Sequence, residues 1–112
     1  MNALIIIPTF NENQNISILI DKIRKLDSLI DLEILVIDDG SPDGTANSVK
    51  EIQKNDSKLH LINREKKLGL GSAYCLGFNW AIKNNFDVIV QMDADLSHNP
   101  NDILRLLSKI ND

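Results

Sequence analysis

Short, mostly apolar runs alternate with amphipathic stretches along this chain, and the alternation restricts the fold more than any other feature of the sequence. The apolar runs cover residues 3–7, 32–37, 59–63 and 88–92. Each has the length of one strand, and their nearly continuous apolar character is typical of strands that are covered on both faces. Strands that alternate with helices predict an α/β fold with a mostly parallel sheet of about four strands.

The stretches between the apolar runs have the three-and-four residue spacing of amphipathic helices. Asn13 or Asn15 suits the cap of the first helix, the second covers about 46–54, and the third follows the loop 64–71. A last helix is expected after Asn99 as its N-cap and Pro100 as its first residue. The apolar faces are Ile16, Leu19, Ile20, Ile23 and Leu26; Val49 and Ile52; Ala73, Leu76, Gly77 and Trp80; and Ile103, Leu106, Leu107 and Ile110.

Length and composition indicate one ordinary globular domain over residues 1–112, with 43% hydrophobic and 25% charged residues. The net charge of -4, without a stripe of Lys and Arg, argues against a nucleic-acid partner. A single cysteine, Cys75, cannot form an internal disulfide, which is typical of a reducing compartment. The first apolar run lacks a basic segment before it and is too short for a leader or a membrane span, so we expect a cytoplasmic protein.

Acidic residues follow three of the four predicted strands. Glu12 follows the first, Asp38 and Asp39 the second, and Asp93 and Asp95 the fourth. The carboxyl ends of parallel strands share one edge of a sheet, so these carboxylates are expected to converge there. Such a cluster needs compensation, and a hard cation such as Mg²⁺ or Mn²⁺ prefers carboxylate oxygens and completes its shell with substrate phosphates. The sequence therefore predicts a metal and phosphate site.

A glycine-rich loop precedes the third helix. Gly69 and Gly71 would let backbone N–H groups approach a phosphate, and Arg64 or Lys67 would supply positive charge beside it. A dinucleotide fingerprint would require a glycine at the position of Tyr74 and a loop that follows the strand directly, and the chain has neither feature. The glycines are therefore expected to shape a turn near an anion.

Four motifs in one order resemble a known family, the GT-A nucleotide-sugar glycosyltransferases, and within it the polyprenyl-phosphate (dolichyl-phosphate) mannose synthases. The motifs are PTFNE (8–12), VIDDGSPDGT (36–45), KKLGLGSAY (66–74) and MDADLSHNP (92–100). They extend over the whole chain at family-like spacing. The resemblance implies a Rossmann-like GT-A nucleotide-sugar-binding domain.

The resemblance also implies roles for individual residues. Asp93 and Asp95 would serve catalysis by binding Mg²⁺ or Mn²⁺, with Ser97 as a further ligand. Phe10 replaces the tyrosine common in the family and keeps its stacking face, and which of the adjacent pair Asp38 and Asp39 faces the ligand is left open. The motifs and loop patterns together predict nucleotide-sugar contacts from Pro8, Thr9, Phe10, Glu12, Ile37, Asp38, Asp39, Gly40, Arg64, Lys67, Gly71, Asp93 and Ala94.

The activity that the resemblance implies is transfer of mannose, with inversion, from GDP-mannose to a polyprenyl or dolichyl phosphate. A phosphate acceptor is already ionised at neutral pH, so no strong general base is required. The lipid acceptor implies a place at the cytoplasmic face of a membrane, to which the chain would be peripheral.

Relatives in this family continue well past the Asp-Ala-Asp motif, so the chain is expected to correspond to their N-terminal, nucleotide-binding part. The apolar strand 88–92 would then lie at an open edge of the sheet. Self-association, or pairing with a chain that completes the domain, is the expected consequence.

Two alternatives remain at this stage. One is a truncated module that binds nucleotide and metal without transferring a sugar. The other is an aspartate-based phosphotransfer domain, because the residues from Asp93 to Ser97 fit the Asp-x-Asp-x-Ser pattern of aspartate-nucleophile phosphatases. The nucleophile of those enzymes normally follows the first strand, and the acidic pair of receiver domains does so too, which counts against this alternative.

Overall fold

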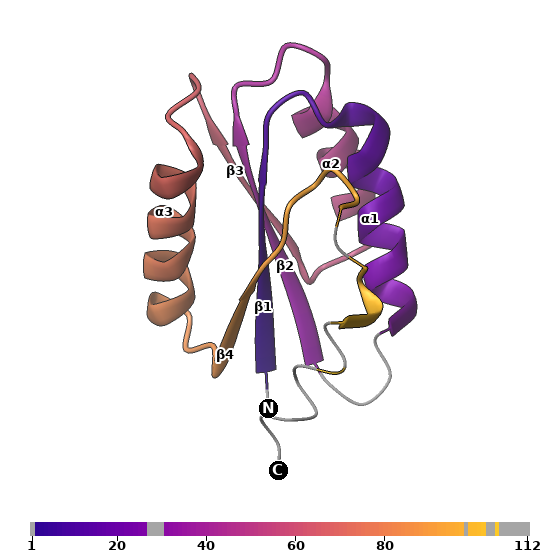
Figure 1. Cartoon of the computed structure of the whole chain (residues 1–112), viewed down its shortest axis with the longest axis vertical. Coiled ribbons are helices and arrows are strands. Elements are labelled where there is room, and N and C mark those ends of the chain that lie inside the picture. The colour runs from indigo at the N-terminus through magenta and orange to yellow at the C-terminus, as the bar shows by residue number, and fades with distance from the viewer. Residues whose placement is uncertain (1, 27–30, 98, 103–104, 106–112) are drawn as a thin grey trace.

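The computed structural model describes residues 2–26, 31–97, 99–102 and 105, and it forms one sheet with helices on both faces (Figure 1). Strands and helices alternate along the chain as the apolar pattern predicts. In chain order they are β1 (Asn2–Thr9), α1 (Asn13–Leu26), β2 (Asp31–Asp39), α2 (Thr45–Gln53), β3 (Leu59–Arg64), α3 (Leu70–Lys83) and β4 (Val88–Gln91).

The described sheet is entirely parallel and has the strand order β3-β2-β1-β4. β1 is therefore central although it is first in the chain, and the strand order reverses between β1 and β4. Such a reversal is the topological switch point at which open α/β sheets bind ligands. The expected fold class, an α/β domain with a four-stranded parallel sheet flanked by helices, is confirmed.

Two apolar layers hold the helices to the sheet. α1 and α2 cover one face through Ile16, Leu19, Ile23 and Val49, whereas α3 covers the other (Figure 1). Gly77 allows the close approach of α3, because a Cβ atom there would lie 2.8 Å from Cδ1 of Ile6. The face of α3 predicted from the sequence is confirmed, since Ala73 and Gly77 are buried and Leu76 and Trp80 pack on the core.

β1 and β2 are longer than the apolar runs predict, and the extra residues are polar or proline. Pro8 pairs with Ile37, and Thr9 pairs with Asp38. Residues two apart on a strand direct their backbone groups to the same side. On the side that faces β4, the carbonyl of Ile6 accepts a hydrogen bond from the N–H of Met92. The next β1 donor on that side would be the N–H of residue 8, but Pro8 has no N–H. The β1–β4 pairing therefore ends there, and the sheet splays apart at the switch point.

The start of α1 differs from the sequence-based expectation. The helix begins at Asn13, so neither Asn13 nor Asn15 precedes it as a cap. The carboxylate of Asp43, in the loop between β2 and α2, instead accepts a hydrogen bond of 3.0 Å from the N–H of Asn13. Asp43 is distant in sequence from the helix it caps, which is why local spacing does not reveal it.

β4 lies at an edge of the described sheet, as predicted, and pairs there with β1 alone. No helix among the described residues has the length and apolar character needed to cross a membrane. The side chain of Asn99 accepts a hydrogen bond from the N–H of Asn101, as expected of an N-cap. The apolar face predicted for the last helix lies outside the described residues.

Candidate functional site

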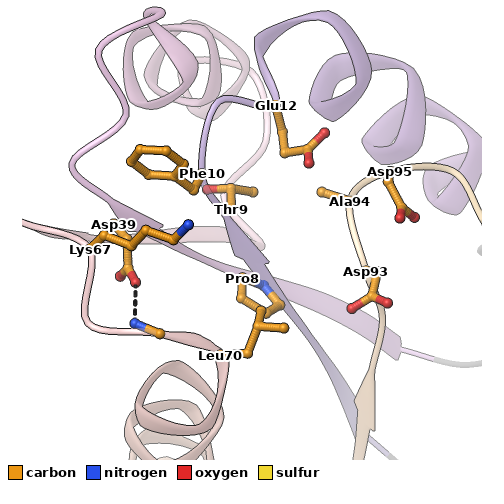
Figure 2. Close-up of a pocket in the computed structure, with 11 residues that line it drawn as sticks. Pro8, Thr9, Phe10, Glu12, Asp39, Lys67, Leu70, Asp93, Ala94 and Asp95 are labelled. Atoms are coloured by element: carbon orange, nitrogen blue, oxygen red, sulfur yellow. Dashed lines mark hydrogen bonds between the residues drawn. The ribbon is translucent and has the colours of Figure 1, made fainter.

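A cavity of about 300 Å³ opens at the carboxyl ends of the strands, where β1 and β4 separate (Figure 2). All four strands contribute to it, through the ends of β1 and β2, the loop into α3 and the segment after β4. It is lined by Pro8, Thr9, Phe10, Glu12, Asp39, Lys67, Gly69, Leu70, Asp93, Ala94 and Asp95. Of the acidic residues predicted to converge at this edge, Glu12, Asp39, Asp93 and Asp95 line the cavity, whereas Asp38 does not.

The two sides of the cavity differ in chemical character. Figure 2 shows Phe10, Asp39 and Lys67 on one side, with Asp93 and Asp95 on the other. The ammonium nitrogen of Lys67 lies 4.7 Å from the centre of the Phe10 ring, which is a cation–π contact. One side therefore offers an aromatic face and a positive charge, and the other offers carboxylates.

Asp39 organises the loop on the aromatic side. One oxygen accepts a 2.5 Å hydrogen bond from Nε of Arg64, and the other accepts hydrogen bonds from the N–H groups of Leu68 and Gly69. Burial alone would raise the pKa of Asp39, but the Arg64 guanidinium and the two N–H groups outweigh it and hold the pKa below its usual value. Asp39 is therefore an anion that fixes the glycine-rich loop against the sheet.

Asp38 is fully buried and does not line the cavity. One of its oxygens accepts hydrogen bonds from the hydroxyls of Thr9 (2.7 Å) and Ser41 (2.6 Å), and the other accepts one from the N–H of Ser41. The side chain of Ile37 is also fully buried. Of the adjacent acidic pair, Asp39 is thus the one that faces the cavity.

Three further predicted contacts lie outside the cavity lining. Gly40 has φ +68°, and a Cβ there would lie 2.7 Å from the carbonyl oxygen of Glu65, so the site needs glycine for packing between loops. Arg64 is engaged with Asp39, Ser72 and the carbonyl of Gly69. Gly71 lies in the first turn of α3, while Gly69 lines the cavity in its place.

Asp93 and Asp95 approach the cavity from the segment after β4. Tyr74 on α3 donates a 3.2 Å hydrogen bond to Oδ1 of Asp93, and Oδ1 of Asp95 accepts one of 2.9 Å from the N–H of Ser97. Burial, together with the Asp93 carboxylate, raises the pKa of Tyr74 to about 12, so its hydroxyl stays protonated. In the described part of the chain, no three His, Cys, Asp or Glu side chains cluster closely enough to hold a metal ion.

These two carboxylates nevertheless fit a divalent cation that shares its ligands with a substrate. Mg²⁺ and Mn²⁺ are commonly bound by one or two carboxylates, with substrate phosphates completing the shell. Asp93 and Asp95 supply oxygen donors that border one cavity, with Ala94 between them. Glu12 lines the same cavity, and its N–H donates to the Thr45 hydroxyl, which fixes its loop against α2.

Sequence reasoning missed two kinds of residue at this site. Leu70 lines the cavity although no motif singled it out, because it is an apolar residue at the start of a helix. In the sequence Tyr74 stands out only as the position where a dinucleotide fingerprint would have glycine. Its contact with Asp93 crosses from α3 to the segment after β4, and only the packing of that helix reveals it.

A parallel α/β sheet with a mixed aromatic and acidic cavity at its switch point defines a Rossmann-like domain of the nucleotide-binding class. The chain belongs to glycosyl transferase family 2, whose sequence profile matches residues 4–112. It is 40% identical over 109 residues to the polyprenol monophosphomannose synthase of Mycolicibacterium smegmatis, and 40% identical over 110 residues to the undecaprenyl-phosphate mannosyltransferase of Micrococcus luteus. These alignments cover 96% and 98% of the chain, but 40% and 44% of the relatives.

Solved structures show the same fold. A mannosyltransferase from Pyrobaculum calidifontis, in complex with GDP-Man and Mn²⁺, matches with a TM-score of 0.79 and 27% identity, over 99% of this chain and 32% of its own. The glucosyl-3-phosphoglycerate synthase of Mycobacterium tuberculosis, with Mn²⁺ and UDP, matches with a TM-score of 0.68 and 27% identity, over 97% and 39% of the two chains. The GT-A fold and the resemblance to polyprenyl-phosphate mannose synthases are thus confirmed, for a chain that spans less than half the length of these relatives.

Proposed function

We propose that this chain forms the nucleotide-sugar-binding part of a polyprenyl-phosphate mannosyltransferase. The reaction is transfer of mannose, with inversion, from GDP-mannose to a polyprenyl or dolichyl phosphate. The observation that carries the proposal is the cavity itself, in which an aromatic ring and a lysine face two carboxylates across the switch point. The names of the two curated relatives supply the sugar and the class of acceptor.

The two sides of the cavity suit the two ends of a nucleotide sugar. Phe10 offers a ring face to the base, once Lys67 moves off it toward the diphosphate. Oδ1 of Asp39, which accepts one hydrogen bond from Arg64, retains one lone pair that can accept a hydrogen bond from the nucleoside. Asp93 and Asp95 would hold a divalent cation, which would neutralise charge on the diphosphate. The space between these groups is bordered by Pro8, Thr9, Glu12 and Ala94. Behind the cavity lining, or through their backbone, the following residues support the site: Ile37, Asp38, Gly40, Arg64 and Gly71.

The transfer breaks the bond between the anomeric carbon of mannose and the diphosphate oxygen, and forms a bond from that carbon to an oxygen of the lipid phosphate. Lys67 is placed to neutralise charge on the departing diphosphate. Bound Mg²⁺ or Mn²⁺ supplies further charge neutralisation and template chemistry there, with Ser97 as a candidate additional ligand. Because the acceptor is an anion already, no residue of this chain needs to remove a proton from it.

The acceptor and the open edge of the sheet imply partners. A polyprenyl phosphate lies in a membrane, so this domain would work at a membrane surface on the cytoplasmic side. Among the described residues β4 pairs with β1 alone, and a second copy or a completing chain would pair with its other edge. We expect sedimentation velocity to show association that increases with protein concentration. A single monomeric species at all concentrations would contradict this part of the proposal.

Calorimetric titration with GDP, UDP and GDP-mannose, with and without Mn²⁺, tests the donor site. We expect GDP and GDP-mannose to bind more tightly than UDP in the presence of Mn²⁺, and Asp93→Asn and Asp95→Asn to abolish the dependence on Mn²⁺. Asp21→Asn is the matched control, because Asp21 is an exposed carboxylate that pairs with Lys25 on α1. Metal-independent binding, or equal loss in the control, would argue against the assignment.

Transfer itself separates an enzyme from a binding module. The chain is incubated with radiolabelled GDP-mannose, Mn²⁺ and a polyprenyl phosphate in detergent, and labelled lipid is extracted. Mannolipid formed by the wild type, but not by Asp93→Asn, would establish a transferase. Nucleotide binding without transfer would indicate that this part of the domain holds the donor and that acceptor-binding residues come from elsewhere.

A further inference from the structure

Tyr74 contacts Asp93, one of the two predicted cation-binding carboxylates, and the proposed function gives it no role. It lies in the second turn of α3 and is half-buried, and its hydroxyl donates to Oδ1 of Asp93 at 3.2 Å. We propose that Tyr74 is a positioning residue that holds the Asp93 carboxylate in the orientation required to bind a divalent cation. This inference rests on the proposed function, in which Asp93 binds that cation.

Asp93 needs such support because the sheet no longer holds it. The last backbone hydrogen bond that joins this segment to β1 runs from the N–H of Met92 to the carbonyl of Ile6, and Pro8 has no N–H to continue the ladder. β4 itself ends at Gln91. Beyond that point the carboxylate depends on side-chain contacts for its direction, and the Tyr74 hydroxyl is the contact that the described structure provides.

The packing of α3 against the sheet fixes the position from which Tyr74 contacts Asp93. Gly77, one turn after Tyr74, lies so close to the sheet that a Cβ there would be 2.8 Å from Cδ1 and 2.9 Å from Cγ2 of Ile6. Ala73, the residue before Tyr74, is buried in the same layer. The helix is therefore fixed at short range beside β1, and the phenol reaches Asp93 from a rigid element instead of from a loop.

The hydrogen bond orients the Asp93 carboxylate and leaves other lone pairs available to a cation. A carboxylate oxygen has two lone pairs, and Oδ2 of Asp93 accepts no hydrogen bond from another described residue. At 3.2 Å the bond is longer than the roughly 2.6 Å common for a hydroxyl that donates to a carboxylate. Partners of this kind, which hold a metal ligand without touching the metal, typically change metal affinity by about 10–100-fold when removed.

The contact is tested first in the absence of metal and nucleotide. Tyr74 is the only tyrosine of the chain, so protein labelled with ¹³C at the tyrosine Cζ gives a single resonance. We expect Asp93→Asn to shift this resonance and Asp95→Asn to leave it in place. An unchanged resonance in Asp93→Asn would overturn the inference, because the hydrogen bond would then be absent in solution.

The positioning role is tested with Mn²⁺ alone, through the paramagnetic broadening of the Ala94 amide signal, which detects even weak binding. We expect Tyr74→Phe to weaken Mn²⁺ binding about tenfold. The control is Cys75→Ala, an exposed neighbour on α3, which should bind Mn²⁺ as the wild type does. Equal Mn²⁺ affinity in Tyr74→Phe and wild type would assign Tyr74 a structural role and overturn the inference, as would a wild type in which Mn²⁺ leaves the Ala94 signal sharp.

Nucleotide binding takes no part in this test, so the two proposals fail separately. A chain that binds Mn²⁺ through Asp93, and more weakly in Tyr74→Phe, but binds neither GDP nor GDP-mannose would contradict the proposed function and retain the positioning role. Equally tight binding of GDP with Mn²⁺ in the wild type and in Tyr74→Phe would retain the proposed function and contradict the positioning role.

Discussion

The two acidic pairs of this chain look alike in the sequence and differ in the structure. Asp38 and Asp39 end β2 at 0% and 5% exposure, and every one of their carboxylate oxygens accepts a hydrogen bond from the protein. Asp93 and Asp95 follow β4, where Asp93 is half-buried and Asp95 is exposed. The first pair builds the loops around the cavity, whereas the second presents oxygens to it.

This difference shows that the neighbours of an acidic residue at a strand end, and not its position alone, decide whether it has a structural or a ligand-binding role. β2 is an inner strand flanked by β1 and β3, so loops from both sides supply donors to its acids. β4 is an edge strand of the described sheet, with β1 as its one neighbour there, and the only hydrogen bond to Asp93 from another described residue comes from Tyr74. The Asp93 carboxylate, whose Oδ2 accepts no hydrogen bond from another described residue, is thus available to a cation.

Replacement of Asp38 tests the structural half of this comparison and should have the largest effect. Asp38→Ala leaves the hydroxyls of Thr9 and Ser41 without their buried acceptor, and we expect the free energy of unfolding to fall by about 3 kcal/mol. Urea unfolding measures it. Asp95→Asn is the comparison variant and should stay within about 0.5 kcal/mol of the wild type. Equal midpoints for the two variants would contradict the division into structural and ligand-binding pairs.

The depressed pKa of Asp39 predicts a dependence of stability on pH. The unfolded carboxyl titrates near its ordinary value of 3.8 and the folded one below it, so the stabilisation is complete above the unfolded value and is lost as pH falls through the folded one. We expect Asp39→Asn to lower the free energy of unfolding by about 2 kcal/mol at pH 7, and the difference from the wild type to shrink below about pH 4. A difference that stays constant from pH 7 to pH 3 would refute the charge-based explanation.

Lys67 tests the basic side of the cavity through binding instead of stability. Lys67→Met keeps the aliphatic length over Phe10 but removes the charge, and we expect the affinity for GDP to fall about tenfold while that for guanosine is unchanged or increases. Lys66→Met is the matched control, since Lys66 is the exposed neighbour outside the cavity lining. Calorimetry with both ligands separates the contributions. An equal loss of affinity for GDP and for guanosine would show that Lys67 does not contact the diphosphate.

Leu96 should give the smallest effect, because two contributions oppose each other. It has φ +65°, a conformation that costs a non-glycine residue about 1–2 kcal/mol, yet its side chain packs on the core beneath α1. Leu96→Gly relieves the backbone strain but loses the side-chain packing, so we expect the free energy of unfolding, measured by thermal unfolding, to change by less than about 1 kcal/mol. Leu96→Ala, which loses packing and keeps most of the strain, should be the less stable variant. The reverse order would indicate that strain is not present.

Much of the fold could be predicted from the sequence because its strands are apolar on both faces. The strands and α3 follow directly from that pattern, and the cavity from the rule for parallel sheets. The ends of β1 and β2 could not be predicted, since Pro8, Thr9 and Asp39 continue the strands through backbone pairing that side-chain polarity does not indicate.

The site was predicted less completely than the fold. Phe10, Lys67, Asp93 and Asp95 lie at the cavity as their motifs indicate. The motifs did not distinguish Asp39 from Asp38, because that choice depends on which side of β2 each carboxylate leaves. Leu70 and the contact of Tyr74 depend on where α3 packs, which sequence spacing does not specify.

The position of β1 at the centre of the sheet has a consequence for how the protein folds. The β1–β2 pairing joins neighbouring parts of the chain, but the β1–β4 pairing joins Ala3 to Val88, across nearly the whole described length. Contacts between residues so far apart are expected to form late, because a long loop must close before they gain any stability. The cavity lies at that junction, so the first three strands can assemble while the polypeptide is still being synthesised, and the capacity to bind a ligand arrives last.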